Sequence, residues 1–209
     1  MAEKLVRLVI ITARNLRTTS DCSPETILNI LENIDPKKYT VEVLLVDSLI
    51  PEMMRVTEQE LIGLPMYIPF AKVLDHPLIT RVINIDNITV DELRRNYDFA
   101  VVAVYNDFGE DGKLLGMLDA VGLPYLSPSL KVSAVCFDKG YTKALLTYAD
   151  VDNPRGFVLH HDRCTTGELD EKIVKKLNYP VVVKPTSSGN SWGVSIVRTK
   201  DDLVRAIDA

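Results

Sequence analysis

The sequence contains few cysteines and no motif that would pair them. Its 209 residues include three, Cys22, Cys136 and Cys164, which lie far apart and form no C-x-x-C pair. Such spacing fits neither a disulfide framework nor a structural zinc site. We therefore expect reduced thiols and a cytoplasmic protein.

The sequence also lacks a positive charge excess and a long apolar run. Its formal net charge of −5 argues against nucleic acid or an anionic membrane as the main partner. The apolar run "LVRLVIIT" is too short and too β-branched for a signal peptide or a membrane span. His160 and His161 are adjacent, so on a strand they would point to opposite faces, which predicts no metal site.

Two common phosphate-binding motifs are absent. The sequence has no G-x-x-x-x-G-K-[ST], and "ARNLRTTSDCS" follows the first apolar run where a dinucleotide-binding protein would have G-x-G-x-x-G. This argues against a Walker-type ATPase and against a Rossmann dehydrogenase.

Strand-like and helix-like patterns alternate in the first part of the chain. Apolar β-branched runs predict strands at 5–12, 40–47 and 98–105, and helical spacing predicts helices at 23–34, 88–96 and 110–122. Ser23 is the expected N-cap of the first helix. The run 98–105 is apolar enough to be central in a parallel sheet. We therefore predict a doubly wound α/β domain, with 48–90 as loop and short strands.

The remainder of the chain predicts a smaller unit. Residues 130–150 indicate one or two helices, followed by a strand at 153–162, a helix at 167–177, two strands at 179–185 and 192–199, and the start of a helix. This last part is too small to bury a core independently, so it resembles a fragment of a larger domain. The expected division is a domain at 1–130, a helical linker at 131–154 and an incomplete α+β lobe at 155–209.

The stretch "VVVKPTSSGNSWGVS" ends an apolar strand, predicted to be buried, with Lys184. A buried ammonium is costly without an anion nearby, and the small residues 186–191 could fold over a polyphosphate. The alternative is a flexible hairpin turn that follows a lysine at a strand end. The residues alone leave both interpretations open.

Four segments resemble the D-alanine–D-alanine ligases of the ATP-grasp superfamily. They occur in the family's order and spacing and are "NILENIDPKKYTVEVLLVD", "FGEDGKLLGMLDAVGLPYLSPS", "SAVCFDKGYTKALL" and "YPVVVKPTSSGNSWGVSIV". The similarity covers nearly the whole chain apart from about 48–90. It implies an N-terminal domain of the type that precedes the ATP-grasp fold, followed by an incomplete ATP-grasp lobe.

The resemblance also implies a reaction and a nucleotide site. Family members use ATP to phosphorylate one D-alanine carboxylate, and the amine of a second D-alanine attacks the acyl phosphate, a step of peptidoglycan biosynthesis. They also pair through the N-terminal domain, which implies a homodimer. By motif position, the residues that would bind the ATP phosphates are Lys139, Lys184, Ser188, Gly189, Asn190 and Ser191.

On the substrate side the sequence departs from the family. Ser23 matches, but Thr19 stands where the family has an acid that contacts the substrate amine, and Tyr105 stands where it has a histidine. Loss of a carboxylate that pairs with an ammonium removes a hydrogen bond worth roughly 1.5–3 kcal/mol. The identity of the substrate is therefore open.

The family's acidic and asparagine Mg²⁺ ligands find no match up to Ala209. We expect Mg²⁺ in the complete enzyme but no turnover by this chain alone. A truncated chain, half of a split enzyme and a degenerate relative would each fit. The alternatives to a D-alanine–D-alanine ligase are an ATP-grasp ligase for a different substrate and a non-catalytic binding or assembly module that retains the fold.

Overall fold

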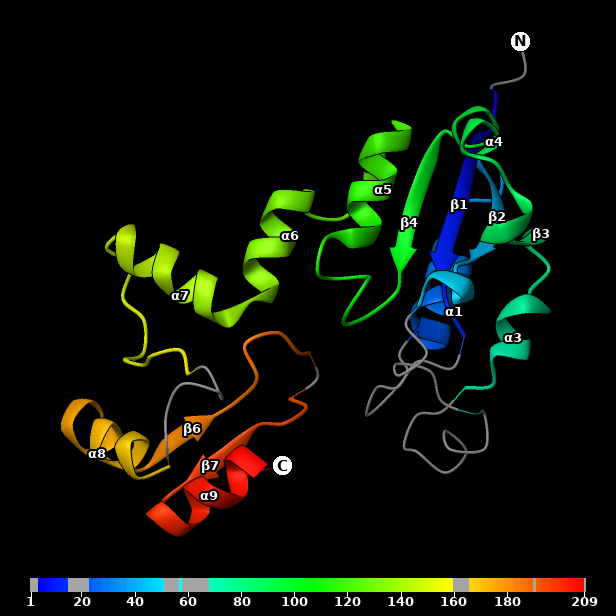
Figure 1. The fold of residues 1–209 in the computed structure, drawn as a ribbon. Helices are drawn as coiled ribbons and strands as arrows, with labels where there is room; N and C mark the ends of the chain where they lie inside the picture. Colours follow the sequence, from blue (N-terminus) through cyan, green and yellow to red (C-terminus); the bar gives the residue numbers. More distant parts are fainter. Residues whose placement is uncertain are drawn as a thin grey trace. The chain divides into compact units, whose positions relative to one another are not determined.

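The computed structural model describes residues 4–14, 23–50, 57, 68–159, 166–189 and 191–208. Two compact units make up the chain, Met1–Ala134 and Val135–Ala209. Figure 1 shows the helices and strands of each. Helix α7 (Lys139–Tyr148) belongs to the second unit, whereas the sequence analysis assigns it to a linker. The division into a domain, a linker and a lobe stays a prediction.

The first unit is built on a five-stranded parallel sheet. Its strands are β1 (Val6–Thr12), β2 (Tyr39–Leu45), β3 (Ile79–Asn84), β4 (Phe99–Ala103) and β5 (Tyr125–Leu126). They lie in the order β3-β2-β1-β4-β5, and every pairing is parallel. Strand β4 is interior because it pairs with both β1 and β5. The structure therefore confirms the prediction of a parallel sheet with the 98–105 segment inside it.

Helices cover both faces of this sheet, as the doubly wound prediction requires. Alternate residues of a strand point to opposite faces. Ile10 of β1 belongs to a core cluster with residues of α1 (Ser23–Asn33) and α3 (Phe70–Leu74). Ile11 belongs to a second cluster with residues of α4 (Val90–Asn96) and α5 (Lys113–Val121). Both faces of the sheet are therefore covered by helices and shielded from water, which explains the consecutive apolar residues of the central strands.

The helix boundaries follow from local chemistry. Thr89 caps α4 in a reciprocal capping box with Glu92, so this helix begins at residue 90. Gly122 ends α5 with a φ of 74°, a left-handed conformation that suits glycine. The 48–90 region contains the strand β3, short 3-10 turns at Asp47–Leu49 and Ile85–Asn87, and the helix α3. Helix α3 was not predicted, because it has five residues and no side-chain cap.

The second unit contains an antiparallel hairpin and helices. The chain enters it through α6 (Leu130–Phe137) and continues into α7, α8 (Thr166–Lys176), β6 (Val181–Val183), β7 (Ser195–Val197) and α9 (Lys200–Asp208). Its small core is formed by Leu169, Ile173, Val197 and Leu203. None of the described helices has the length and apolar character needed to cross a membrane.

The strand predicted at 153–162 is wrong for the part that the structure describes. Residues 151–159 form no strand, and residues 160–162, including both adjacent histidines, lie outside the described residues. The segment is held by other contacts: the side-chain amide of Asn153 donates to Thr147 and to the carbonyl of Val151, while Phe157 packs against the small core. Side-chain hydrogen bonds of this kind compete with strand pairing.

Stability of the first unit should depend on pH through Asp98. Hydrogen bonds from the side chain and backbone of Arg7 hold the pKa of Asp98 well below its usual range. A depressed folded-state pKa contributes stability above the unfolded pKa of about 3.9, and this contribution is lost as the pH falls toward the folded value. Asp98→Asn should therefore destabilise the protein at pH 7, and this difference should shrink below about pH 4.

Urea unfolding at several pH values measures this difference. Asp91→Asn is the control, because that carboxylate is 80% exposed and pairs with Arg95 at 3.4 Å. A difference between wild type and Asp98→Asn that stays constant from pH 7 to pH 2.5 would contradict the assignment.

Candidate functional site

The strand order reverses between β1 and β4, and ligands of open parallel sheets commonly bind beyond the carboxyl ends of strands at such a point. Tyr105 follows β4 there, and its hydroxyl lies 2.7 Å from that of Thr26 in the first turn of α1. Ser23 is the first residue of α1, but its side chain lies outside the described residues, as does Thr19. Of the three predicted substrate-side residues, only Tyr105 thus has described side-chain contacts.

Asn106 is the most unusual residue beside this point. It is 9% exposed, its φ is 62°, and its side-chain Oδ1 has no hydrogen-bond partner among the described residues. Its backbone N–H donates to the carboxylate of Glu110 at 2.8 Å. Asparagine is among the side chains that best tolerate the left-handed conformation found there.

In the second unit, Lys139 meets the loop that follows Lys184. The Nζ atom of Lys139 donates to the carbonyl oxygens of Ser188 at 2.6 Å and Thr186 at 3.4 Å. Desolvation and the nearby ammonium of Lys184 lower the pKa of Lys139, while Asp138 acts in the opposite direction. The structure therefore brings two predicted phosphate-binding lysines within electrostatic range of each other.

Lys184 departs from the sequence-based expectation in one respect. The strand β6 that precedes it is not buried, since Val182 is 56% exposed, and Lys184 itself is exposed. The prediction of a lysine at the end of a buried strand is wrong, because only one face of the two-stranded sheet packs against the small core. An exposed ammonium needs no buried counterion, so its proximity to Lys139 becomes the more informative feature.

The loop after Lys184 is compact where it is described. The N–H of Trp192 donates to the carbonyl of Gly189 at 3.0 Å, and Ser191 adopts a φ of 58°. Ser188 donates its hydroxyl to the carbonyl of Gly189 at 3.3 Å. Asn190 lies outside the described residues. The predicted residues Ser188, Gly189 and Ser191 therefore share one turn.

Asp138 connects helix α7 to this loop and is not among the site residues predicted from the sequence. It is the N-cap of α7, and its Oδ1 accepts hydrogen bonds from the N–H groups of Gly140 at 2.7 Å and Tyr141 at 2.9 Å. Its Oδ2 accepts from the Ser187 hydroxyl at 3.1 Å. An acid just before a helical pattern is a sequence signal for the cap, but no local signal reveals the contact with Ser187, 49 residues away.

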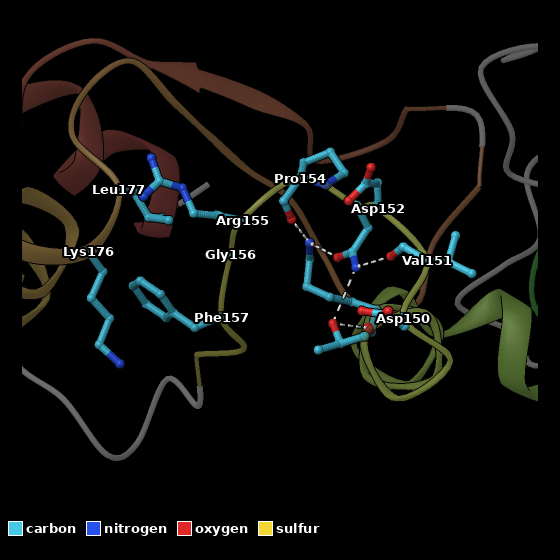
Figure 2. Close-up of a pocket in the computed structure, with 12 residues that line it drawn as sticks. Asp150, Val151, Asp152, Pro154, Arg155, Gly156, Phe157, Lys176 and Leu177 are labelled. Carbon is cyan, nitrogen blue, oxygen red and sulfur yellow. Dashed lines mark hydrogen bonds between the residues drawn. The ribbon is translucent and has the colours of Figure 1, made fainter.

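A cavity of about 560 Å³ lies elsewhere in the second unit. It is lined by the end of α7, residues 150–157 and the end of α8, and Figure 2 shows Phe157, Lys176 and Leu177 on its wall. Lys143 is held there by the carbonyl of Pro154 and the Oδ1 of Asn153. Neither Lys139 nor Lys184 lines this cavity. Its cations are accompanied by the carboxylates of Asp150 and Asp152, so it has no clear preference for an anion.

A metal site is not formed by the described residues, which contain no group of three or more His, Cys, Asp or Glu side chains able to hold an ion. Mg²⁺ therefore has no fitting ligand set in this part of the chain, and no step of the chemistry is assigned to it here.

Gly140 is required by a close approach. A Cβ atom there would lie 2.7 Å from Cγ2 of Val158 and 3.0 Å from Oδ1 of Asp138. Gly140→Ala should therefore destabilise the second unit by about 1–3 kcal/mol, the usual cost of overpacking. Thermal or urea unfolding measures this cost. The double variant Gly140→Ala/Val158→Ala removes the nearer contact and should recover part of the loss; no recovery would place the conflict at Asp138 instead.

The comparisons with known proteins agree with the fold. The family model described as "D-ala D-ala ligase C-terminus" matches residues 148–209. The D-alanine–D-alanine ligase A of Bacillus cereus is 37% identical over 117 residues, which cover 56% of this chain and 38% of that protein. The crystal structure of the Bacillus anthracis D-alanine–D-alanine ligase covers 97% of this chain at 25% identity, with a TM-score of 0.66.

The same B. anthracis ligase complexed with ATP superposes with a TM-score of 0.63 at 23% identity, a likeness of fold. The parallel-sheet domain followed by the helix and hairpin unit is therefore the ATP-grasp class of fold. Within that class, the chain is similar to the D-alanine–D-alanine ligases, which confirms the resemblance read from the sequence. It spans about half of the B. anthracis structure, with 53% of that chain covered.

Proposed function

We propose that the chain is part of an ATP-dependent carboxylate–amine ligase of the D-alanine–D-alanine type, and that Lys139 and Lys184 bind the ATP phosphates. The observation that carries this proposal is that the ammonium of Lys184 lies within electrostatic range of Lys139, where it acts together with desolvation to lower the pKa of Lys139. Two like charges held together repel each other, and a polyanion between them relieves that repulsion. A triphosphate has the charge and the length to contact both.

The phosphoryl group is the part of the reaction that these lysines would serve. Transfer of the γ-phosphoryl group to a carboxylate spreads negative charge over its oxygens, and catalysis is mainly positioning and charge stabilisation. The Lys139 ammonium has three N–H donors, two of which point to the carbonyls of Thr186 and Ser188. Among the described residues, the third N–H has no acceptor, so it is available to an anion.

The exposed face of the hairpin suits the nucleotide base. Val182 of β6 lies opposite Ile196 of β7, and the two side chains are 56% and 58% exposed. Val182 and Lys184 are two residues apart, so they share a face of the strand. A base on this apolar surface would direct its phosphates toward Lys184. The proposal thus accounts for apolar side chains that a soluble domain would otherwise keep covered.

A second candidate is a ligase of the same reaction type for another substrate. It is favoured by the neutral groups near the switch point, where the hydroxyls of Tyr105 and Thr26 contact each other and the amide of Asn106 is buried. Phenol and amide groups can bind a carboxylate or an amine through hydrogen bonds but provide no fixed charge. Substrate choice would then depend on shape and hydrogen bonds more than on an ion pair.

Peptidoglycan biosynthesis, a cytoplasmic location, Mg²⁺ in the complete enzyme and a homodimer through the N-terminal domain are supported by the family relationship. The absence of turnover by this chain alone stays a prediction from the sequence. A non-catalytic binding module is the less favoured alternative, because both phosphate-side lysines are present.

Substitution of either lysine tests the proposal. Lys139→Ala and Lys184→Ala should each weaken ATP binding by about tenfold or more, because each removes a charge-assisted hydrogen bond to a phosphate. Calorimetric titration of ATP into the chain measures this effect. Lys175→Ala on the exposed side of α8 is the matched control and should bind like wild type. Equal ATP affinity for all four proteins would refute the phosphate assignment.

A further inference from the structure

The contact between Asp138 and Ser187 joins two segments that are far apart in the sequence. Asp138 uses both carboxylate oxygens: Oδ1 caps α7 through Gly140 and Tyr141, and Oδ2 accepts the hydroxyl of Ser187. One side chain therefore fixes the start of the helix and the loop together. Its two functions can be separated by substitution, because they use different oxygens.

The backbone strengthens this connection. Asp138 and Ser187 form an isolated antiparallel bridge, and the N–H of Lys139 donates to the carbonyl of Thr186 at 2.8 Å. The bridge fixes which loop residue lies opposite Lys139. As a result, the carbonyls of Thr186 and Ser188, on either side of Ser187, face the Lys139 ammonium.

Apart from this bridge and the two hydrogen bonds of the Lys139 ammonium, few contacts hold the loop in this register. Its described residues from 186 to 189 are small, Ser187 is exposed, and Ser191 and Gly193 have positive φ values. The turn bonds of Trp192 and Val194 stay within the loop, so they stabilise its shape without fixing it to α7. Among the described residues, the only side chain that links Ser187 to the helix is that of Asp138.

From this geometry we infer that Asp138 is a positioning residue: through Ser187 it holds the loop carbonyls on the Lys139 ammonium and so directs the remaining N–H donor toward a nucleotide phosphate. This inference rests on the proposed function. Asp138 itself need not touch the nucleotide. The loop then orients the Lys139 side chain in addition to covering the phosphates.

Ser187→Ala tests this inference because it removes the link while leaving the helix cap intact. We expect ATP binding to weaken by about three- to tenfold, the range for loss of one hydrogen bond. The backbone N–H of Lys139 should also exchange faster with solvent, because its acceptor Thr186 has lost one of the contacts that hold it. Ser195→Ala in β7 is the matched serine control and should leave both measurements unchanged.

Substitutions of Asp138 separate the link from the cap. Asp138→Ser keeps an oxygen that can cap α7 but has no second acceptor for Ser187, so it should match Ser187→Ala. Asp138→Asn keeps the capping oxygen and can donate its amide N–H to the Ser187 hydroxyl, so it should stay within about twofold of wild type. If Asp138 acted only as a helix cap, Asp138→Ser would bind ATP with the affinity of wild type.

The outcomes distinguish this inference from the proposed function. If ATP affinity depends on Lys139 but Ser187→Ala binds and exchanges like wild type, the positioning role is overturned. If ATP affinity does not depend on Lys139 at all, the proposed function fails. In that case, unchanged exchange of the Lys139 N–H in Ser187→Ala would also remove the structural basis of the positioning role.

Discussion

The approach of the Lys139 and Lys184 ammonium groups is the constraint on which the candidate site of the second unit depends, because desolvation and the neighbouring charge both lower the pKa of Lys139. The two lysines come from different elements, the start of α7 and the end of β6, so the chain must hold them together against their charge. It does so with neutral or negative partners: carbonyls of the loop contact Lys139, and Asp138 lies next to it. Charges held in this way are prepared for an anion, because little rearrangement remains when it binds.

The first unit presents a different chemistry. Its parallel sheet brings the segments after β1 and β4 to one edge, where the described side chains include the hydroxyls of Tyr105 and Thr26, the amide of Asn106 and the ion pair between Arg14 and Asp47. The second unit therefore contributes the two lysine ammonium groups, whereas this edge combines neutral hydrogen-bonding groups with charges that are already paired or hydrogen-bonded. In a ligase of this family, such a separation would assign nucleotide binding to one unit and substrate choice to the other.

The sequence predicts elements whose pattern is local and strong. The runs at 5–12 and 98–105 become β1 and β4 because burial on both faces favours consecutive apolar residues, as at 8–11 and 99–103. Helix α3 and the absence of a strand at 153–159 could not be predicted, since the first is very short and the second depends on the side-chain contacts of Asn153. The lysines were found through motif positions, whereas the pairs Asp138–Ser187 and Thr26–Tyr105 depend on residues brought together only by folding. The exposure of Val182 was missed because three consecutive valines resemble a buried strand.

The central claim is that the lysines and their loop, and not the separate cavity beside α8, form the nucleotide site. The most direct measurement is nuclear magnetic resonance of the isotopically labelled chain, titrated with a non-hydrolysable ATP analogue and observed at the backbone amides and lysine side chains. The account predicts that the largest shifts occur at Lys139, Lys184 and residues 186–191. Shifts concentrated at residues 150–157, Lys176 and Leu177, with Lys139 and Lys184 unchanged, would contradict it.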